Sequence, residues 1–335
     1  MTKPEVLITG ANGEVGHGLI KALADDGRYS VIAMDLREME PEMKRRCKAF
    51  YQGDILDGSF LQQLGSEHRF HIIFHLAGLL SSAAETNPDL GHHVNVEGSR
   101  NIFNIARNHC KWLDRRVVFL FSSSIAAYGV RPGDDQSRAL KERQYLTPAT
   151  MYGINKLYVE QLGRYYSEFY KKGEQDYQRI DFRCLRFPGL ISPDTLPSGG
   201  TSDYGPEMLH AAAQGERYEC FVRPDTRIPF MVMSDAIRSI MMLSHAPLAG
   251  LQHRIYNVTA FSVSAADMET KIREHFPGVQ IGYEPNPARQ AIVDSWPNDV
   301  DDQAARQDWG WQPEFGFHQA FDQLLVPKVK QRYSL

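Results

Sequence analysis

Apolar positions in the first half of the chain alternate between two spacings. Short β-branched and apolar runs, typical of buried strands, recur between segments whose apolar residues are spaced as on helices. The runs that predict strands are Glu5–Thr9, Tyr29–Asp35, Ala49–Gly53, Phe70–Leu76, Arg116–Ser122 and Ile180–Phe187. The segments that predict helices are Val15–Ala24, Phe60–Leu64, Val96–Asn108 and a long stretch from Thr147, as its cap, to Lys172. This βαβ alternation predicts an α/β fold with a doubly wound parallel sheet between two helical layers.

The pattern changes after the last of these strands. Residues 188–206 are rich in Pro, Gly, Ser and Thr, which indicates a long loop of the kind that is functional or disordered. Later elements are expected at Asp235–Ser244, Ile255–Val258, Ala265–Phe276, Val279–Tyr283 and Phe317–Leu325. We therefore expect a nucleotide-binding domain at residues 1–180 and a smaller α/β, mainly substrate-binding domain at 181–335. The boundary is approximate, and the chain is free to cross it.

Composition and charge exclude several classes of protein. The chain is 42% hydrophobic with a formal net charge of −4, so it lacks the basic surface that binds nucleic acid. No apolar run reaches the roughly 20 residues that span a membrane. The cysteines are scattered without a Cys-x-x-Cys pair, at Cys47, Cys110, Cys184 and Cys220. Together with a first strand that leaves no room for a signal peptide, this favours a cytoplasmic protein without disulfides.

A glycine-rich segment, TGANGEVG, joins the first strand to the first helix. Its spacing, G-x-x-G-x-x-G, is a variant of the dinucleotide-binding fingerprint. The first glycine permits a tight turn, the second lets backbone N–H groups approach a pyrophosphate, and the third lets helix and strand pack closely. The helix N-terminus adds unpaired donors for phosphate. The predicted cofactor-binding residues of this loop are Gly10, Asn12, Gly13, Glu14, Val15 and Gly16.

Acidic residues at the ends of the next two strands extend the cofactor site. Asp35 ends the second strand, where a carboxylate accepts hydrogen bonds from adenosine ribose hydroxyls and repels a 2′-phosphate. This favours NAD over NADP, with Arg37 as a complication and a turn or cap role for Asp35 as the alternative. Asp54 ends the third strand, where it would contact the edge of the adenine base. The alternative is that it only forms a turn. The glycine-rich loop and Asp35 together predict that the parallel sheet is of the Rossmann type.

Tyr152 and Lys156 are four residues apart and therefore share one helix face. A phenol with a pKa of about 10 is a poor base at neutral pH. A neighbouring ammonium and an oxidised nicotinamide both favour the phenolate, which would let Tyr152 accept a hydroxyl proton. The run Ser122–Ser124 ends a strand at the carboxyl edge of the sheet, where ligands bind. A hydroxyl from this run would hold the substrate oxygen beside the phenol.

The order of these features resembles the extended short-chain dehydrogenase/reductase superfamily over residues 5 to about 325. The resemblance implies that Ser124 is the catalytic serine and Tyr152 the base. It also implies that Lys156 binds the nicotinamide ribose and lowers the pKa of Tyr152. Further cofactor contacts implied in this way are Ile55, Leu76, Ala77, Gly78, Ser122, Tyr152, Lys156 and Pro188. Gly78 departs from the superfamily, which usually has alanine there.

Four further segments, at 79–82, 199–204, 289–297 and 308–311, resemble the short-chain type of L-threonine 3-dehydrogenase. This implies NAD-dependent oxidation of the 3-hydroxyl of L-threonine to 2-amino-3-oxobutanoate. The substrate-binding residues expected are Ser81, Ser124, Tyr152, Thr201, Ser202, Asp203 and Trp296. Hydroxyls would donate to the carboxylate, Asp203 would accept from the ammonium, and Trp296 would close the pocket. The alternatives are a helix cap for Asp203 and a core aromatic for Trp296.

Two other functions remain open from the sequence. One is a sugar-nucleotide epimerase or dehydratase of the same superfamily with tightly bound NAD, and the other is a non-catalytic NAD-binding regulator. The histidine pairs lack the spacing or the third ligand of a metal site, so no catalytic metal is expected. The resemblance implies a homodimer packed through the helices near 96–108 and 149–172. A small amino acid is the expected partner, with neither nucleic acid nor membrane.

Overall fold

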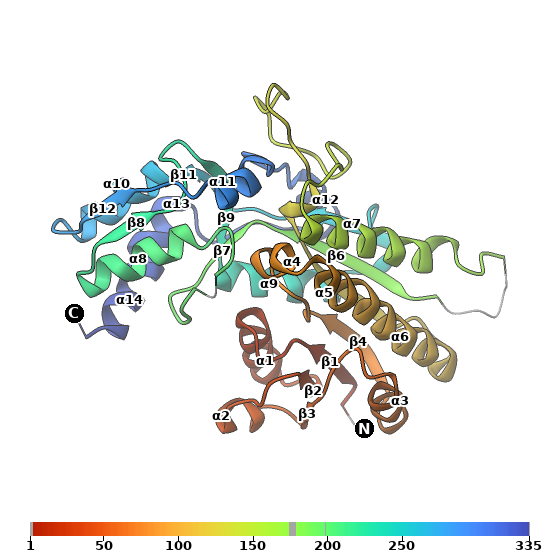
Figure 1. The fold of residues 1–335 in the computed structure, drawn as a ribbon. Coiled ribbons are helices and arrows are strands. Elements are labelled where there is room, and N and C mark those ends of the chain that lie inside the picture. The colour runs from red at the N-terminus through yellow and green to blue at the C-terminus, as the bar shows by residue number, and fades with distance from the viewer. Residues whose placement is uncertain (1–2, 174–178, 198, 335) are drawn as a thin grey trace.

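A seven-stranded sheet forms the centre of the molecule (Figure 1). The computed structural model describes residues 3–173, 179–197 and 199–334. The sheet order is β10-β6-β5-β4-β1-β2-β3, and every neighbouring pair is parallel. Its strands are β1 (Glu5–Thr9), β2 (Ser30–Asp35), β3 (Ala49–Gln52), β4 (Phe70–His75), β5 (Val118–Ser124), β6 (Asp181–Phe187) and β10 (Ile255–Asn257). This confirms the Rossmann-type, doubly wound α/β fold expected from the sequence.

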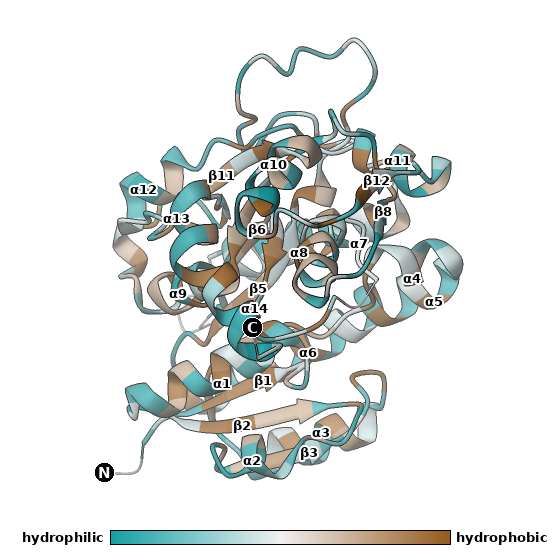
Figure 2. Cartoon of the chain, turned by 90° about the vertical axis from the view of Figure 1, so that its left-hand side faces the viewer, coloured by the Kyte–Doolittle hydropathy of each residue, from teal (hydrophilic) through white to brown (hydrophobic). Residues whose placement is uncertain are grey.

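Helices cover both faces of this sheet because successive strand side chains point to opposite sides. Leu7 of β1 belongs to a core shared with one helical layer, whereas Val6 and Ile8 belong to the core under the other. The first layer holds α3 (Gly58–Glu67), α6 (Ser99–Leu113) and α7 (Met151–Arg164), and the second holds α1 (Glu14–Asp26) and α9 (Met233–His245). In Figure 2 the central strands carry the hydrophobic colour, while α1 carries both colours.

The helix that carries Tyr152 begins later than expected. Thr150, not Thr147, is its cap: the Thr150 hydroxyl accepts a hydrogen bond from the Gly153 N–H at 3.0 Å. Thr147 instead donates to the carbonyl oxygen of Gly129 at 3.1 Å. Tyr152 therefore lies in the first turn of α7. Past Arg164 the helix continues as a π-helical turn, Tyr165–Phe169, so the expected end at Lys172 was too late.

A second unit, built largely from the later residues, packs beside the sheet. It contains a three-stranded sheet, β11-β9-β7, and a parallel pair, β12-β8. Its elements are β7 (Gly189–Ile191), α8 (Tyr204–Gln214), β8 (Tyr218–Cys220), β9 (Arg227–Val232), β11 (Phe261–Ser264), α10 (Ala265–His275), β12 (Ile281–Tyr283), α11 (Pro287–Asp294) and α14 (Val326–Arg332). The expected loop at 188–206 was therefore too long, because β7 pairs with β9 inside it and α8 begins at Tyr204.

The remaining elements are short. They are α2 (Pro41–Lys44), α4 (Ser81–Thr86), α5 (Pro88–His92), a π-helical turn at His93–Gly98, 3-10 turns at Ile125–Ala127 and Leu248–Gly250, α12 (Gln303–Trp309), α13 (Phe317–Gln319) and a π-helical turn at Ala320–Leu325. None of the helices in the described ranges combines the length and apolar character of a membrane span.

The chain returns to the first sheet after residue 180. β6 and β10 lie in the same sheet as β1, and α9 packs on α1. The sheet order reverses at β1, because β2 and β3 follow on one side and β4 on the other. Ligands of open α/β sheets bind at such a reversal, outside the carboxyl ends of the strands. A division of cofactor and substrate roles near residue 180 stays a prediction.

Candidate active site

The glycine-rich loop brings the ends of β1 and β4 into close contact. Gly10 has a φ of +69°, and a Cβ placed on it would lie 2.6 Å from the backbone nitrogen of Ala77. A Cβ on Gly16 would lie 2.5 Å from the carbonyl oxygen of Ala11. Only glycine fits at these two positions. Gly13 precedes α1 and provides no side-chain cap, so the N–H groups of the first turn are left for another acceptor.

Asp35, the predicted ribose-binding residue, lies against this loop. One carboxylate oxygen accepts the N–H of Asn12 at 2.9 Å and the other accepts the N–H of Arg37 at 3.0 Å. A carboxylate has about four acceptor positions, so two remain for further donors such as ribose hydroxyls. The Arg37 side chain is exposed, with its Nε 4.0 Å from Asp35. The loop, the uncapped helix and Asp35 together fit a dinucleotide.

Asp54 and Ile55 lie at the end of β3. An oxygen of Asp54 accepts the N–H of Leu56 at 2.9 Å, which is the plain turn considered as the alternative. Ile55 is buried, and a Cβ on Gly98 would come within 2.4 Å of its Cδ1. Asn101 donates to the carbonyl oxygen of Ile55 at 3.0 Å. Contact of Asp54 and Ile55 with adenine stays a prediction.

Gly78, the departure from the superfamily pattern, has a local explanation. A Cβ on Gly78 would lie 2.9 Å from the Asn95 side-chain oxygen, which already accepts the N–H of Leu79 at 2.7 Å. Alanine at 78 would push this amide away. Asn95 also donates back to the carbonyl oxygen of Leu79 at 3.2 Å. Leu76 donates its N–H to Thr9 at 3.1 Å, which holds the end of β4 beside β1.

His75 supports the same strand end and was not among the predicted residues. Its Nδ1 is 2.7 Å from the Thr9 hydroxyl and its Nε2 is 2.8 Å from the Ser99 hydroxyl. Ser99 donates its proton to the Asn95 carbonyl, so Nε2–H of His75 donates to Ser99. Burial lowers the pKa of His75 to about 3, which keeps the ring neutral. The periodicity of a strand gives no sign of such a contact.

The end of β5 meets one face of α7 at three consecutive residues. The hydroxyls of Ser124 and Tyr152 are hydrogen-bonded to each other. Lys156 Nζ donates to the carbonyl oxygen of Ser122 at 2.6 Å. The Ser123 hydroxyl donates to a Glu160 oxygen at 2.6 Å. The structure therefore brings the predicted Ser124, Tyr152 and Lys156 together. Glu160 was missed, although its spacing of four from Lys156 places it on the same helix face.

Burial governs how the two key groups titrate. It raises the pKa of Tyr152 to about 12, against the opposing hydrogen bond with Ser124. It also lowers the pKa of Lys156 to about 8. The Lys156 ammonium lies 5.4 Å from the Tyr152 ring centroid and 4.6 Å from that of Phe121. Burial thus disfavours the phenolate in the protein without cofactor. A lowering of the Tyr152 pKa by Lys156 together with the oxidised nicotinamide stays a prediction.

Two of the predicted substrate-binding residues meet directly. The hydroxyls of Ser81 on α4 and Thr201 are 2.8 Å apart and buried. Ser82 donates to the carbonyl oxygen of Gly199 at 2.6 Å, so α4 holds the loop before α8 at two points. Ser202, next to Thr201, is partly buried.

Asp203 occupies the N-cap position of α8, the alternative considered for it, but its side chain does not cap the helix. One of its oxygens accepts the N–H groups of Gly199 at 2.9 Å and Gly200 at 2.6 Å. It thereby closes the turn ahead of the helix. Arg289 donates to the Gly200 carbonyl oxygen at 2.7 Å from the other side. Binding of a substrate ammonium by Asp203 stays a prediction.

Trp296 and Pro188 are both buried. Trp296 belongs to the core of the second unit, against which Tyr152 also packs. Its indole N–H has no hydrogen-bond partner among the described residues, so it is an available donor inside that core. Pro188 lies between β6 and β7. This position does not show whether Pro188 contacts the cofactor, so that contact stays a prediction.

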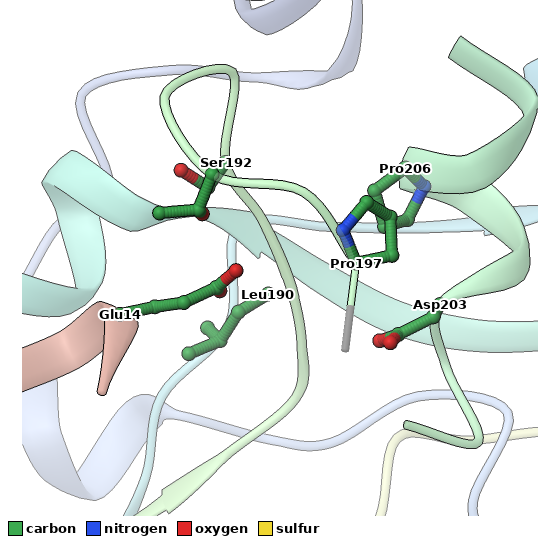
Figure 3. A pocket seen from close by; sticks show the side chains of 7 residues that line it. Glu14, Leu190, Ser192, Pro197, Asp203 and Pro206 are labelled. Carbon is green, nitrogen blue, oxygen red and sulfur yellow. The ribbon is translucent and has the colours of Figure 1, made fainter. Parts of the chain in front are cut away.

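A small pocket joins the start of α1 to the loop before α8 (Figure 3). Its volume is about 20 Å³, room for about one water molecule, and the carboxylates of Glu14 and Asp203 both line it. Burial raises the pKa of Glu14, and the charge of Asp203 adds to this, whereas a hydrogen bond from Thr195 opposes it. The predicted cofactor loop and the predicted substrate loop therefore face each other across this pocket.

Comparisons with known proteins agree with this geometry. The family model described as the NAD-dependent epimerase/dehydratase family matches residues 6–259. The mitochondrial L-threonine 3-dehydrogenase of Bos taurus is 36% identical over 96% of this chain and 81% of its own. A solved monomeric L-threonine 3-dehydrogenase from a metagenome is 36% identical, covers 97% and 99% of the two chains, and has a TM-score of 0.84. The Trypanosoma brucei L-threonine 3-dehydrogenase is 30% identical, covers 100% and 99%, and has a TM-score of 0.87.

Proposed function

Because the chain belongs to the NAD-dependent epimerase/dehydratase family, we propose that it oxidises the 3-hydroxyl of L-threonine to 2-amino-3-oxobutanoate with NAD. The observation that carries the chemistry is the convergence of Ser124, Tyr152 and Lys156 at the carboxyl edge of the sheet. The substrate assignment is supported by relatives named L-threonine 3-dehydrogenase, which match nearly the whole chain.

The residues that would hold NAD are those of the glycine-rich loop and the neighbouring strand ends. The first-turn N–H groups of α1 would bind the pyrophosphate, and Asp35 the adenosine ribose. The close approach of Gly10 to Ala77 leaves the loop without side chains where the phosphates would pass. Lys156 would bind the nicotinamide ribose.

The mechanism assigns one task to each catalytic side chain. When bound, oxidised NAD supplies the acceptor for the hydride from carbon 3 and a positive charge close to the phenol. Tyr152 Oη accepts the proton of the substrate 3-hydroxyl, and Ser124 Oγ donates a hydrogen bond to the same oxygen. Lys156 in its ammonium form stabilises the Tyr152 phenolate, which counteracts the effect of burial on the phenol.

The amino-acid end of the substrate would lie between α4 and the loop before α8. Ser81 and Thr201 are supported as donors to the carboxylate by their buried contact, and Ser202 lies beside them. Asp203, which closes the turn beside these hydroxyls, would accept from the ammonium. The Trp296 indole would exclude water from the pocket.

A homodimer is part of the same proposal. Four large side chains on α7 and the turn after it are about half exposed: Ile154, Tyr158, Tyr165 and Phe169. A solvent-exposed stripe of this kind is typical of an interface. A cytoplasmic location is proposed on the four cysteines, all free thiols, which suit a reducing compartment.

A substrate screen tests the function. Purified protein is mixed with NAD and L-threonine, and NADH formation is followed by absorbance. NADH accumulation with L-threonine supports the proposal. Turnover of a UDP-sugar without net NADH would assign the chain to the epimerases instead, and NAD binding without any turnover would indicate a regulator.

A further inference from the structure

A fully buried ion pair lies directly behind the catalytic residues. Arg186 of β6 donates from Nε to one Glu160 oxygen at 2.8 Å and from Nη2 to the other at 2.6 Å. The side chains are 1% and 0% exposed. Burying two charges carries a desolvation penalty that their attraction often only balances, so stability alone is a weak reason to have such a pair. Its contacts with the active site suggest what else it does.

Glu160 is connected to the serine run through Ser123. The Ser123 hydroxyl donates to Glu160 at 2.6 Å, on the opposite face of β5 from the neighbouring Ser124. This bond fixes the strand end to α7, one helical turn beyond Lys156. The backbone that carries Ser124 is thereby held at a set distance from the helix that carries Tyr152.

Arg186 extends the same connection to the segment after Ser124. Its guanidinium lies 4.8 Å from the ring centroid of Tyr128 and donates to the Glu142 carbonyl oxygen at 2.7 Å. The Tyr128 hydroxyl in turn donates to Asn257 of β10 at 2.8 Å. The ion pair therefore joins β5, β6, β10 and α7 at one point.

The pair also includes a negative charge, on Glu160, that acts on Lys156. The titratable groups that act on or face this ammonium in the described chain are Tyr152 and Glu160 on α7, His75 on β4, and Cys184 with Arg186 on β6. Burial keeps Tyr152, Cys184 and His75 neutral, because it raises the pKa of Tyr152 and Cys184 and lowers that of His75. Glu160 is thus the group whose negative charge favours the ammonium.

We propose that Glu160 and Arg186 form a positioning pair for the proposed dehydrogenation: Glu160 holds Ser124 in place through Ser123, and its charge, balanced by Arg186, keeps Lys156 protonated. The inference rests on the proposed function only in naming the reaction. Neither residue touches the substrate or the reacting atoms.

Glu160→Gln tests the charge. The amide keeps an oxygen for Ser123 but removes the negative charge, so Lys156 should titrate about one pH unit lower. The titration is followed by NMR of isotope-labelled lysine side chains, with Lys156→Arg to assign the signal. The alkaline limb of the pH–rate profile should move to lower pH by the same amount. An unchanged Lys156 titration would overturn this half of the inference.

The double variant Glu160→Gln/Arg186→Gln removes both charges and leaves no unpaired buried ion, so it also serves if the single variant fails to fold. Its Lys156 titration should return at least halfway to that of the native protein. A shift as large as in the single variant would show that Arg186 does not balance the charge.

A second buried pair on β6 provides the matched control. Arg183 and Asp181 are 2.7 Å apart and 4% and 5% exposed, but the arginine's other partners are the backbone carbonyls of Leu243 and Ala246. Asp181→Asn and Glu160→Gln should both lower the melting temperature, but Asp181→Asn should not move the Lys156 titration. An equal shift in both variants would mean that loss of any buried charge produces the effect.

Ser123→Ala tests the geometry without changing a charge. We expect kcat to fall about tenfold with little change in KM or in the Lys156 titration, because only the orientation of Ser124 is relaxed. A native kcat would overturn the positioning half. If L-threonine is not oxidised at all, the proposed function fails, while the lysine titrations still decide whether the pair controls Lys156.

Discussion

Tyr152 differs from phenylalanine by the single oxygen on which the proposed proton transfer depends. Tyr152→Phe should therefore lower kcat by about 10²–10⁴-fold, the usual contribution of a positioned acid or base. The affinity for NAD, measured by titration calorimetry, should stay close to native because the proposed phosphate and adenosine contacts lie on other elements. Substantial turnover by the variant would refute Tyr152 as the base.

Glu5, at the start of β1, provides a prediction for acid stability. Burial acts to raise its pKa, but hydrogen bonds from Lys48 at 2.5 Å, the Arg69 N–H at 2.9 Å and His68 at 3.2 Å prevail and lower it to about 2. A lowered carboxyl pKa adds stability above the ordinary value of 4.5, and this is lost as pH falls towards 2.

The variant Glu5→Gln should melt a few degrees lower than the native protein at pH 7. The difference should shrink between about pH 4.5 and 2, as followed by thermal unfolding across that range. A difference that does not depend on pH would show that the stabilisation is not electrostatic.

Single residues also show what the sequence can predict and what it cannot. Ser124, Tyr152 and Lys156 could be selected because their order along the chain and their spacing are visible in the sequence. The raised pKa of Tyr152 could not, because desolvation depends on which residues surround the phenol. Glu160 was overlooked because its partner Arg186 lies on another element, and no local spacing connects them.

At the scale of elements, α4 links the predicted substrate loop to the catalytic helix. Ser81 and Ser82 hold the loop at one end, and at the other Glu85 accepts the N–H of Met151 in the first turn of α7 at 2.6 Å. A carboxylate at a helix N-terminus is favourable, and here it comes from a separate helix. Closure of the loop on a substrate would therefore reach Tyr152 through α4.

Glu85→Ala should lower kcat about tenfold while changing KM and the melting temperature little, because the helix keeps its Thr150 cap. Glu85→Gln retains an acceptor for the Met151 N–H and should restore most of the rate. Steady-state kinetics of both variants check this. Equal rates for alanine, glutamine and the native residue would show that α4 is not coupled to α7.

Elements differ in how well the sequence predicts them. The strands of the central sheet are five to seven residues long in most cases, and their existence was predicted correctly. β7, of three residues, was included in a loop because so short a run has no period. The start of α7 was misplaced because Thr147 and Thr150 are both suitable caps, and only tertiary contacts distinguish them.

At the scale of the whole molecule, the chain crosses between the two units more than once. The predicted boundary at residue 180 was approximate and allowed the chain to cross it, and β6 and β10, which follow residue 180, complete the first sheet. Sheet order depends on contacts between distant segments, which composition does not record. The crossing places β6, with Arg186, directly against the catalytic end of β5.

The exposed stripe on α7 makes the proposed dimer testable. Tyr158→Glu places a charge in the middle of that stripe, and burying an unpaired charge at an interface is unfavourable. Analytical ultracentrifugation should give a dimer for the native chain and a monomer for the variant. A monomeric native chain with full activity would contradict the proposed assembly and leave the active site assignment intact.

The most direct test of the central claim follows the hydrogen on carbon 3 of the substrate. L-threonine labelled with deuterium at that carbon is incubated with the protein and NAD, and the NADH formed is analysed by mass spectrometry. The account predicts that every NADH carries one deuterium and that 2-amino-3-oxobutanoate forms in equal amount. Unlabelled NADH, or labelled threonine returned unchanged, would contradict it.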